Sequence, residues 1–345
     1  MEEDPFEKIQ TKALEERVPL SVHIDLTYLC NLRCAHCYVV PRNCPELSAS
    51  EVKGILEQLA VAGTFYISLS GGEILTREDF FEVASYARQL NFSLRLLTNG
   101  ILVDEAIVAK IASLHPELVS VSIYSMDPSV HDRITGQVGS LDRTLSAVKL
   151  LRDKEIKVKI SVVVMTHNIK SYPLVHAFAM GVGAEFQIDA RVTLQSDGGQ
   201  SPLALRIDDQ SLYSLLSNPM TYEDESPPDP GDPDAGTFNT MPCGAGHMSC
   251  YISPYGDVYP CVQLPLNCGN LRQESFAKIW TTSPQLLDFR SLTVQDLTEC
   301  SKCSLFEYCR LCVGLNYVER GDLKLPSSEA CREAKIMKEL SRKRR

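Results

Sequence analysis

The sequence has 345 residues, 44% of them hydrophobic and 23% charged, a globular composition sufficient for one large or two modest domains. Its 34 lysines and arginines are outnumbered by 44 aspartates and glutamates, and the formal net charge of −10 disfavours nucleic acid as a partner. No apolar run approaches the roughly 18 residues of a membrane span, and the acidic residues 1–4 do not resemble a signal peptide, so we expect a cytoplasmic protein without membrane contact.

Apolar, β-rich runs alternate with helical patterns over the first 205 residues. The predicted strands cover residues 18–26, 64–69, 92–97, 119–124, 158–164 and 184–192. The predicted helices cover 52–62, 80–89, 104–114, 141–152 and 172–180, with capping boxes expected at Ser48–Glu51 and Thr76–Asp79. A spacing of about 30 residues predicts parallel strands joined by helical crossovers. The sheet is either doubly wound or a partial barrel, and both place chemistry at the carboxyl ends of the strands.

Thirteen cysteines form two groups, four between residues 30 and 44 and nine from residue 243 onward. In a reducing compartment, so many cysteines indicate metal binding more than disulfides. The first group, Cys30-x3-Cys34-x2-Cys37, directly follows the first predicted strand. Three thiolates on one short loop can bind three irons of a cubane cluster and leave the fourth iron open. The alternative is a zinc site completed by His36 or Cys44, although structural zinc usually takes paired C-x2-C knuckles.

This cysteine loop resembles the signature of the radical S-adenosylmethionine (SAM) superfamily. Gly71-Gly72-Glu73, after the second predicted strand, resembles the family's Gly-Gly-Glu motif. Two glycines let a ligand approach the backbone, and the glutamate supplies a carboxylate for the methionine ammonium.

The same resemblance implies weaker cofactor contacts. Tyr38 would meet the adenine, Asn99 would lie near the cofactor at the end of the third strand, and Ser122 would contact the ribose or carboxylate. Arg133 would pair with the cofactor carboxylate. A simple Asn-Gly turn at Asn99 and a surface salt bridge at Arg133 are the alternatives.

The resemblance implies a partial (β/α)6 barrel over about residues 20–205 that binds SAM and a [4Fe-4S] cluster. Reduction of the cluster by an electron donor of the flavodoxin or ferredoxin type would cleave SAM. The resulting 5′-deoxyadenosyl radical would abstract hydrogen from the substrate, while the barrel positions the reactants and excludes water.

The C-terminal cysteines begin around a predicted hairpin, residues 251–259, with its turn at 254–256. The run Cys300-x2-Cys303-x5-Cys309-x2-Cys312 by itself would suit a zinc knuckle. The whole set resembles the SPASM extension of radical SAM peptide-modifying enzymes, except that two residues rather than three separate Cys309 from Cys312.

This resemblance implies two auxiliary iron–sulfur clusters of the [4Fe-4S] type, held by separate ligand sets: Cys243, Cys261 and Cys312, and Cys300, Cys303, Cys309 and Cys331. The fourth ligand of the first set stays open. Cys250 lies opposite Pro260 in the hairpin, and therefore on the other face from Cys261. Cys268 matches no ligand position.

The predicted organisation is an α/β chain with an N-terminal segment (1–19), a radical SAM partial barrel (20–205), an acidic Pro-rich bridge (206–242), an α+β SPASM domain (243–332) and a basic tail (333–345). It most resembles maturases of ribosomally made peptides, near those of pyrroloquinoline quinone and mycofactocin. The substrate would be a precursor peptide, modified by crosslinking, decarboxylation or backbone excision. Because few residues precede the first strand, we expect a separate small protein to recognise the leader peptide. A tetrapyrrole-modifying enzyme of haem synthesis and a non-enzymatic zinc scaffold are the alternatives.

Overall fold

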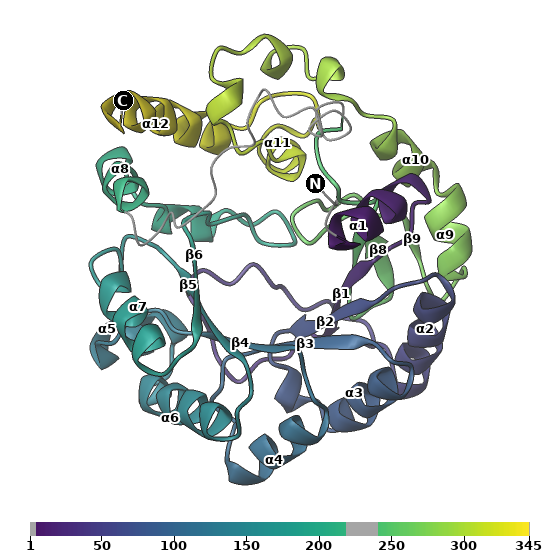
Figure 1. Ribbon diagram of the computed structural model, residues 1–345, viewed down its shortest axis with the longest axis vertical. Coiled ribbons are helices and arrows are strands. Elements are labelled where there is room, and N and C mark those ends of the chain that lie inside the picture. The colour runs from purple at the N-terminus through teal and green to yellow at the C-terminus, as the bar shows by residue number, and fades with distance from the viewer. Residues whose placement is uncertain (1–4, 219–240, 345) are drawn as a thin grey trace.

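The structure, a computed structural model, describes residues 5–218 and 241–344 and is built on one curved nine-stranded sheet (Figure 1). Six strands pair in parallel and in chain order: β1 (Ser21–Thr27), β2 (Tyr66–Gly71), β3 (Ser93–Thr98), β4 (Leu118–Ser122), β5 (Val158–Val163) and β6 (Glu185–Asp189). The crossover helices lie on the outer face: α2 (Ala49–Val61), α3 (Phe80–Gln89), α4 (Glu105–Ser113), α6 (Ser140–Asp153) and α7 (Tyr172–Gly181). Because a doubly wound sheet reverses its strand order and carries helices on both faces, this arrangement is the partial barrel.

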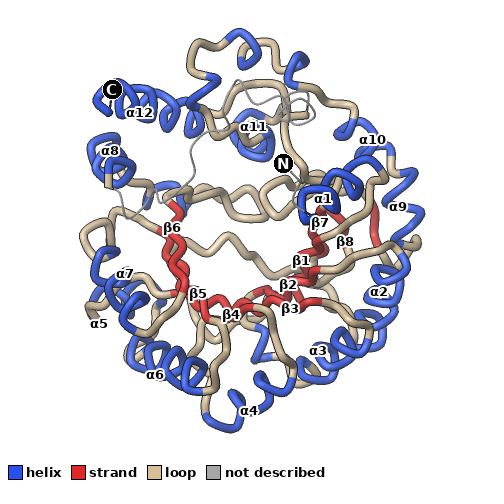
Figure 2. Tube along the Cα trace, viewed as in Figure 1, coloured by secondary structure: helices blue, strands red, loops and turns tan. Residues whose placement is uncertain are grey.

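The two faces of β1–β6 differ sharply in polarity. Outward-facing Val22, Ile67 and Val119 are fully buried against the helices. Alternate residues face inward and are mostly polar: His23, Ser68, Arg95, Ser120, Lys159, Ser161 and Gln187. Since side chains alternate along a strand, one face forms the core and the other leaves the barrel interior open and polar. Figure 2 shows the strands as an arc around this interior.

The C-terminal region extends the same sheet. β7 (Ser249–Ile252) pairs in parallel with β1, and β8 (Asp257–Tyr259) and β9 (Gly269–Asn270) follow in antiparallel order. Tyr251 pairs with Tyr259, which places Cys250 opposite Pro260, as expected from the position of the turn. Four helices follow: α9 (Phe276–Thr282), α10 (Pro284–Arg290), α11 (Val313–Arg320) and α12 (Ser328–Arg344). In Figure 1, α9 continues the outer helix layer beside α2, and α11 and α12 lie across the side that the barrel strands leave open.

Some local predictions were correct and others wrong. The capping box at Ser48 and Glu51 is present at the start of α2. The box expected before α3 is not formed, because Thr76 belongs to a 3-10 turn and donates to the Glu73 carbonyl at 2.7 Å, while Arg77 binds Asp79.

Among the described residues up to 218, three helices lie in segments for which no helix was predicted. These are α1 (Pro5–Glu15) near the N-terminus, α5 (Pro128–Thr135) after β4, and α8 (Asp209–Ser217) in the predicted bridge. The basic tail is the end of α12, and the acidic run 223–240 lies outside the described residues. Across residues 5–218 and 241–344, no helix is both long and apolar enough to cross a membrane.

Candidate functional site

The loop that carries Cys30, Cys34 and Cys37 leaves the carboxyl end of β1 and rests on the last turn of α5. Arg33 N donates to the Thr135 carbonyl at 2.9 Å, and Ala35 N donates to the Ile134 carbonyl at 2.9 Å. Gly136 ends α5 with a φ of 73°, and a Cβ there would lie 3.0 Å from the Arg33 carbonyl oxygen. The end of α5 therefore sets the position of the cysteine loop.

The Gly71-Gly72 pair supports the same loop from β2. A Cβ at Gly71 would lie 2.1 Å from the Thr27 carbonyl oxygen, and one at Gly72 would lie 2.2 Å from that of Leu29. Gly72 N donates to the Thr27 carbonyl at 2.7 Å, and Glu73 N donates to that of Leu29 at 2.9 Å. The close neighbour is thus the chain's own backbone, whereas sequence reasoning expected a ligand in that space.

Glu73 is a buried carboxylate with only 1% of its surface exposed. It accepts hydrogen bonds from Thr98 Oγ1 at 2.8 Å, from Asn99 N at 2.7 Å and from Leu75 N at 3.2 Å. Burial raises the pKa of Glu73, and these hydrogen bonds oppose the rise. The side chain joins the end of β3 to the turn after β2, close behind the cysteine loop.

Two of the predicted cofactor residues lie beside the cysteines. Asn99 Nδ2 donates to Asn31 Oδ1 at 2.7 Å and lies 3.9 Å from Cys30 Sγ. Tyr38 follows Cys37 and lines the barrel cavity, where burial raises the pKa of its hydroxyl well above the usual value.

The other two predicted cofactor residues have different surroundings. Ser122, at the end of β4, hydrogen-bonds to buried Tyr124. Arg133 is exposed on α5, and its charge helps lower the pKa of Asp127 at the start of that helix.

The three N-terminal thiols form one group. Burial raises the pKa of Cys30 and Cys37 and raises that of Cys34 to about 12. Cys34 lies within electrostatic range of both other thiols. Hydrogen bonds and the charge of Arg33 oppose this rise only in part, so a bound cation would hold these side chains as thiolates.

The seven C-terminal ligand candidates form the two groups expected from the resemblance. Cys261 lies within electrostatic range of Cys243 and Cys312. The second group consists of Cys300, Cys303, Cys309 and Cys331, which lie within electrostatic range of one another. Burial raises the pKa of Cys261 to about 11 and that of Cys309 to about 12.

A recurring hydrogen bond marks several of these thiols. A backbone N–H two residues further on donates to the sulfur of Cys30 at 3.4 Å, of Cys243 at 3.3 Å and of Cys303 at 3.4 Å. Such donors stabilise sulfur that carries negative charge, as in cluster ligands.

The three remaining cysteines differ. Cys268 Sγ donates a hydrogen bond to the Leu266 carbonyl at 3.3 Å, Cys250 is 3% exposed within the core, and Cys44 is exposed on the surface. Neither Cys250 nor Cys268 is among the thiols whose charges raise the pKa of Cys261, and the fourth ligand of that group stays open.

The donor set fits iron–sulfur clusters. Within the described ranges, no three or more His, Cys, Asp or Glu side chains are arranged to hold a single metal ion. Zinc requires such a compact tetrahedral set, whereas a cubane spreads its thiolate ligands over separate irons.

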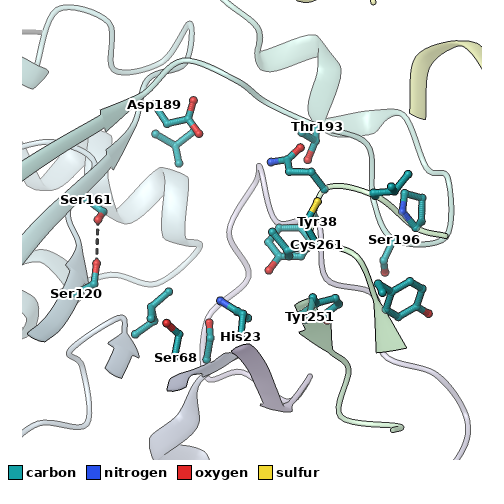
Figure 3. Close-up of a pocket in the computed structure, with 18 of the residues that line it drawn as sticks. His23, Tyr38, Ser68, Ser120, Ser161, Asp189, Thr193, Ser196, Tyr251 and Cys261 are labelled. Atoms are coloured by element: carbon teal, nitrogen blue, oxygen red, sulfur yellow. Dashed lines mark hydrogen bonds between the residues drawn. The ribbon is translucent and has the colours of Figure 1, made fainter. Parts of the chain in front are cut away.

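A cavity of about 700 Å³ fills the barrel between the two cysteine regions. Figure 3 shows Tyr38, Cys261, His23 and Tyr251 around the same space. Sequence reasoning missed these lining residues, although their signal is present as polar residues at alternate positions of β1 to β6. The cavity connects the predicted cofactor region to one auxiliary cysteine.

Three cationic side chains line this cavity. Arg42 pairs with Asp257 at 2.5 Å, and Arg95 pairs with Glu117 at 2.9 Å. Lys159 forms no ion pair with the described residues, and burial lowers its pKa.

A second cavity of about 510 Å³ lies behind β6 and reaches Cys312. Gln187, Asp189 and Gln263 line both cavities and so form the wall between them. Burial raises the pKa of Asp189.

Comparison with known proteins gives two family matches. Residues 24–175 match the radical SAM superfamily, and residues 243–312 match an iron–sulfur cluster-binding domain, SPASM.

Individual relatives cover most of the chain. The AdoMet-dependent heme synthase of Methanosarcina barkeri is 26% identical over 88% of this chain and 94% of its own. The mycofactocin maturase MftC of Mycolicibacterium smegmatis is 28% identical over 85% and 77%, and the PqqA peptide cyclase of Xanthomonas axonopodis pv. citri is 29% identical over 79% and 77%. The structure of Streptococcus suis SuiB bound to precursor peptide SuiA matches with a TM-score of 0.72 at 18% identity, covering 96% of this chain and 82% of that one, which supports the fold.

Proposed function

Because this chain is a radical SAM enzyme with an iron–sulfur cluster-binding SPASM domain, we propose that it modifies a ribosomally made precursor peptide. The observation that carries the proposal is the cavity of about 700 Å³ between Tyr38 and Cys261, into which polar side chains of the barrel strands project. A substrate there contacts the cofactor side and the auxiliary-cluster side at once.

The ligand assignments follow the three thiol groups. Cys30, Cys34 and Cys37 would hold the [4Fe-4S] cluster that binds SAM, with Gly71, Gly72, Glu73, Asn99, Tyr38 and Ser122 around the cofactor. Cys243, Cys261 and Cys312 would hold one auxiliary cluster, and Cys300, Cys303, Cys309 and Cys331 the other. When bound, SAM and the first cluster supply a 5′-deoxyadenosyl radical that takes a hydrogen atom from the substrate.

The chain's own residues bind and orient the substrate. Serine hydroxyls on β2, β4 and β5 offer hydrogen bonds to peptide groups, and their small size leaves room for a chain segment. Lys159 provides a positive charge for a substrate carboxylate. The aromatic wall of Tyr28, Tyr38 and Tyr251 excludes water from the reacting atoms.

Three relatives support a peptide substrate. MftC and the PqqA cyclase are named for peptide maturation, and SuiB has been crystallised with its precursor peptide. The proposal includes a separate small leader-recognition protein, since a chain of net charge −10 offers no general basic surface for an acidic leader. It also includes a flavodoxin- or ferredoxin-type electron donor and a cytoplasmic location.

The test is turnover by anaerobically reconstituted enzyme. Synthetic precursor peptides encoded beside this chain are incubated with SAM and a reductant, and 5′-deoxyadenosine and peptide mass are followed together. Modification should depend on Cys30, Cys34 and Cys37 and should increase when the neighbouring small proteins are added. SAM cleavage without any change in peptide mass would contradict the peptide substrate.

A tetrapyrrole substrate is the second candidate. It is supported by the similarity to the protein named AdoMet-dependent heme synthase and by three cations lining the cavity, which suit the carboxylates of a porphyrin. Loss of mass from an iron porphyrin carrying propionates, with no leader-recognition protein present, would favour this function over peptide modification.

A further inference from the structure

A line of hydrogen bonds crosses the junction between β1 and β7 at the edge of the barrel cavity. Tyr251 donates its hydroxyl to Asp25 Oδ2 at 2.8 Å, and the Tyr28 hydroxyl lies 2.7 Å from that of Tyr251. On the other side, His23 Nε2 lies 3.1 Å from Asp25 Oδ1. His23 and Tyr251 are register partners on neighbouring strands, and both line the cavity.

Asp25 fixes the direction of these bonds. Its carboxylate is 0% exposed and lies behind the cavity wall, and each of its oxygens accepts one of the two contacts. Burial raises the pKa of the Tyr251 hydroxyl far above its usual value, so the proton stays on that oxygen and points to Asp25. The remaining carboxylate oxygen requires a proton on His23 Nε2.

The consequence lies at the other ring nitrogen. With Nε2 protonated, neutral His23 presents Nδ1 as an unprotonated acceptor. Nδ1 has no hydrogen-bond partner in residues 5–218 and 241–344, and it is not one of the buried unsatisfied atoms there. The ring is half-buried and lines the cavity, so Nδ1 is open to a substrate.

We propose that His23 is the base that takes the substrate proton in an oxidative modification, and that Asp25 is the positioning residue that fixes its tautomer. The inference rests on the proposed function. One substrate C–H bond breaks when a hydrogen atom leaves to the adenosyl radical, and the remaining electron passes to an auxiliary iron–sulfur cluster as oxidant. A second hydrogen, on a neighbouring substrate atom, leaves as a proton to His23 Nδ1, and its bonding pair stays with the substrate.

Other titratable groups face the same space. Arg42 and Arg95 are paired with carboxylates. Lys159 also lines the cavity, and it can accept a proton only in its deprotonated form. Asp189, on β6, is the other side chain able to accept a proton, and burial raises its pKa. The experiment therefore compares His23 with Asp189.

The first experiment follows two products with a deuterated substrate. His23→Gln should still transfer deuterium into 5′-deoxyadenosine, while oxidised product falls by about 10²–10⁴-fold, the usual contribution of a general base. Asp25→Asn should cause a similar fall in kcat with little change in KM. The exposed His115→Asn variant is the control and should match wild type. Full product from His23→Gln, or loss in Asp189→Asn alone, would overturn the assignment and leave the peptide-modifying function intact.

The second experiment needs no turnover. Histidine-ring ¹⁵N NMR on the full, cluster-loaded chain should show His23 with a protonated Nε2 and an unprotonated Nδ1, its signals being assigned by their loss in His23→Gln. Asp25→Asn should shift the neutral ring toward the other tautomer. If the neutral His23 ring of the wild type is protonated at Nδ1, the proposed pairing of His23 with Asp25 is refuted, whatever the substrate is.

Discussion

A close backbone contact in the candidate site, at Gly72, is the basis of the sharpest prediction, Gly72→Ala. The added Cβ would lie 2.2 Å from the Leu29 carbonyl oxygen, 2.7 Å from its carbon and 2.9 Å from the Tyr28 carbonyl oxygen. All three atoms are backbone, so no side chain can rotate away, and the loop leading to Cys30 must move by about 1 Å to restore ordinary contact.

The magnitude follows from what this movement disturbs. Overpacking costs about 1–3 kcal/mol, and two backbone hydrogen bonds, Gly72 N to Thr27 and Glu73 N to Leu29, each contribute about 0.5–1.5 kcal/mol. We expect the free energy of unfolding to fall by about 2–6 kcal/mol, with the strain concentrated in the cysteine loop. A misplacement of about 1 Å at a reacting centre can cost about 10²-fold in rate, and we expect that fall in 5′-deoxyadenosine formation.

The assay combines SAM cleavage with iron content and urea unfolding. Gly54→Ala is the matched control, because a Cβ at Gly54 meets nothing within 4 Å and the residue lies inside α2. The free energy of unfolding of this control should rise by about 0.5–1 kcal/mol from the higher helix propensity of alanine, and the variant should cleave SAM as the wild type does. If Gly72→Ala retains wild-type stability and cleavage, the glycine pair does not position the loop, and the reasoning from backbone contact fails.

Three further predictions follow from the thiols and the cavity. Replacing Cys30, Cys34 and Cys37 together by Ala should abolish 5′-deoxyadenosine formation and lower iron from about twelve to about eight per chain if all clusters are cubanes; zinc without sulfide in the remaining sites would contradict the C-terminal assignment. Cys268→Ser should keep the iron content, because this thiol donates to a carbonyl, whereas Cys261→Ser should lose iron from one cluster; equal iron in both would exclude Cys261 as a ligand. Burial lowers the pKa of Lys159 in the folded chain, so the unfolded chain binds the ammonium proton more tightly. The contribution of Lys159 to the free energy of unfolding therefore rises with pH between its lowered folded pKa and its ordinary pKa. Lys159→Met should therefore be more stable than wild type at neutral pH, with an advantage that shrinks as the pH approaches about 10.4 in urea titrations; an advantage independent of pH would show that Lys159 carries no such penalty.

The sequence predicts the barrel well because each strand is a short β-rich run bounded by a helical pattern. All six parallel strands form near the expected residues, and the Cys250–Pro260 register follows from the turn. The polar inner face was missed because runs such as 18–26 were treated as uniformly apolar, although His23 and Asp25 alternate with Val22 and Ile24. The purpose of Gly71 and Gly72 could not be predicted, because sequence spacing does not reveal that residues 27–29 pass against them.

The junction of β1 with β7 makes the barrel and the cysteine-rich region one mechanical unit. Ser21, Val22, His23 and Ile24 pair with Ser249–Ile252, so backbone hydrogen bonds fix the two regions relative to each other. The chain leaves β1 toward Cys30 and leaves β8 toward Cys261, and both strands border the same cavity. A slip of one residue would turn every side chain of the strand to the opposite face, so the pairing register resists change and holds the span between the two thiol groups. Asp25 and Tyr251 meet across this same junction, and the proton acceptor is therefore aligned by the pairing that sets the distance across the cavity.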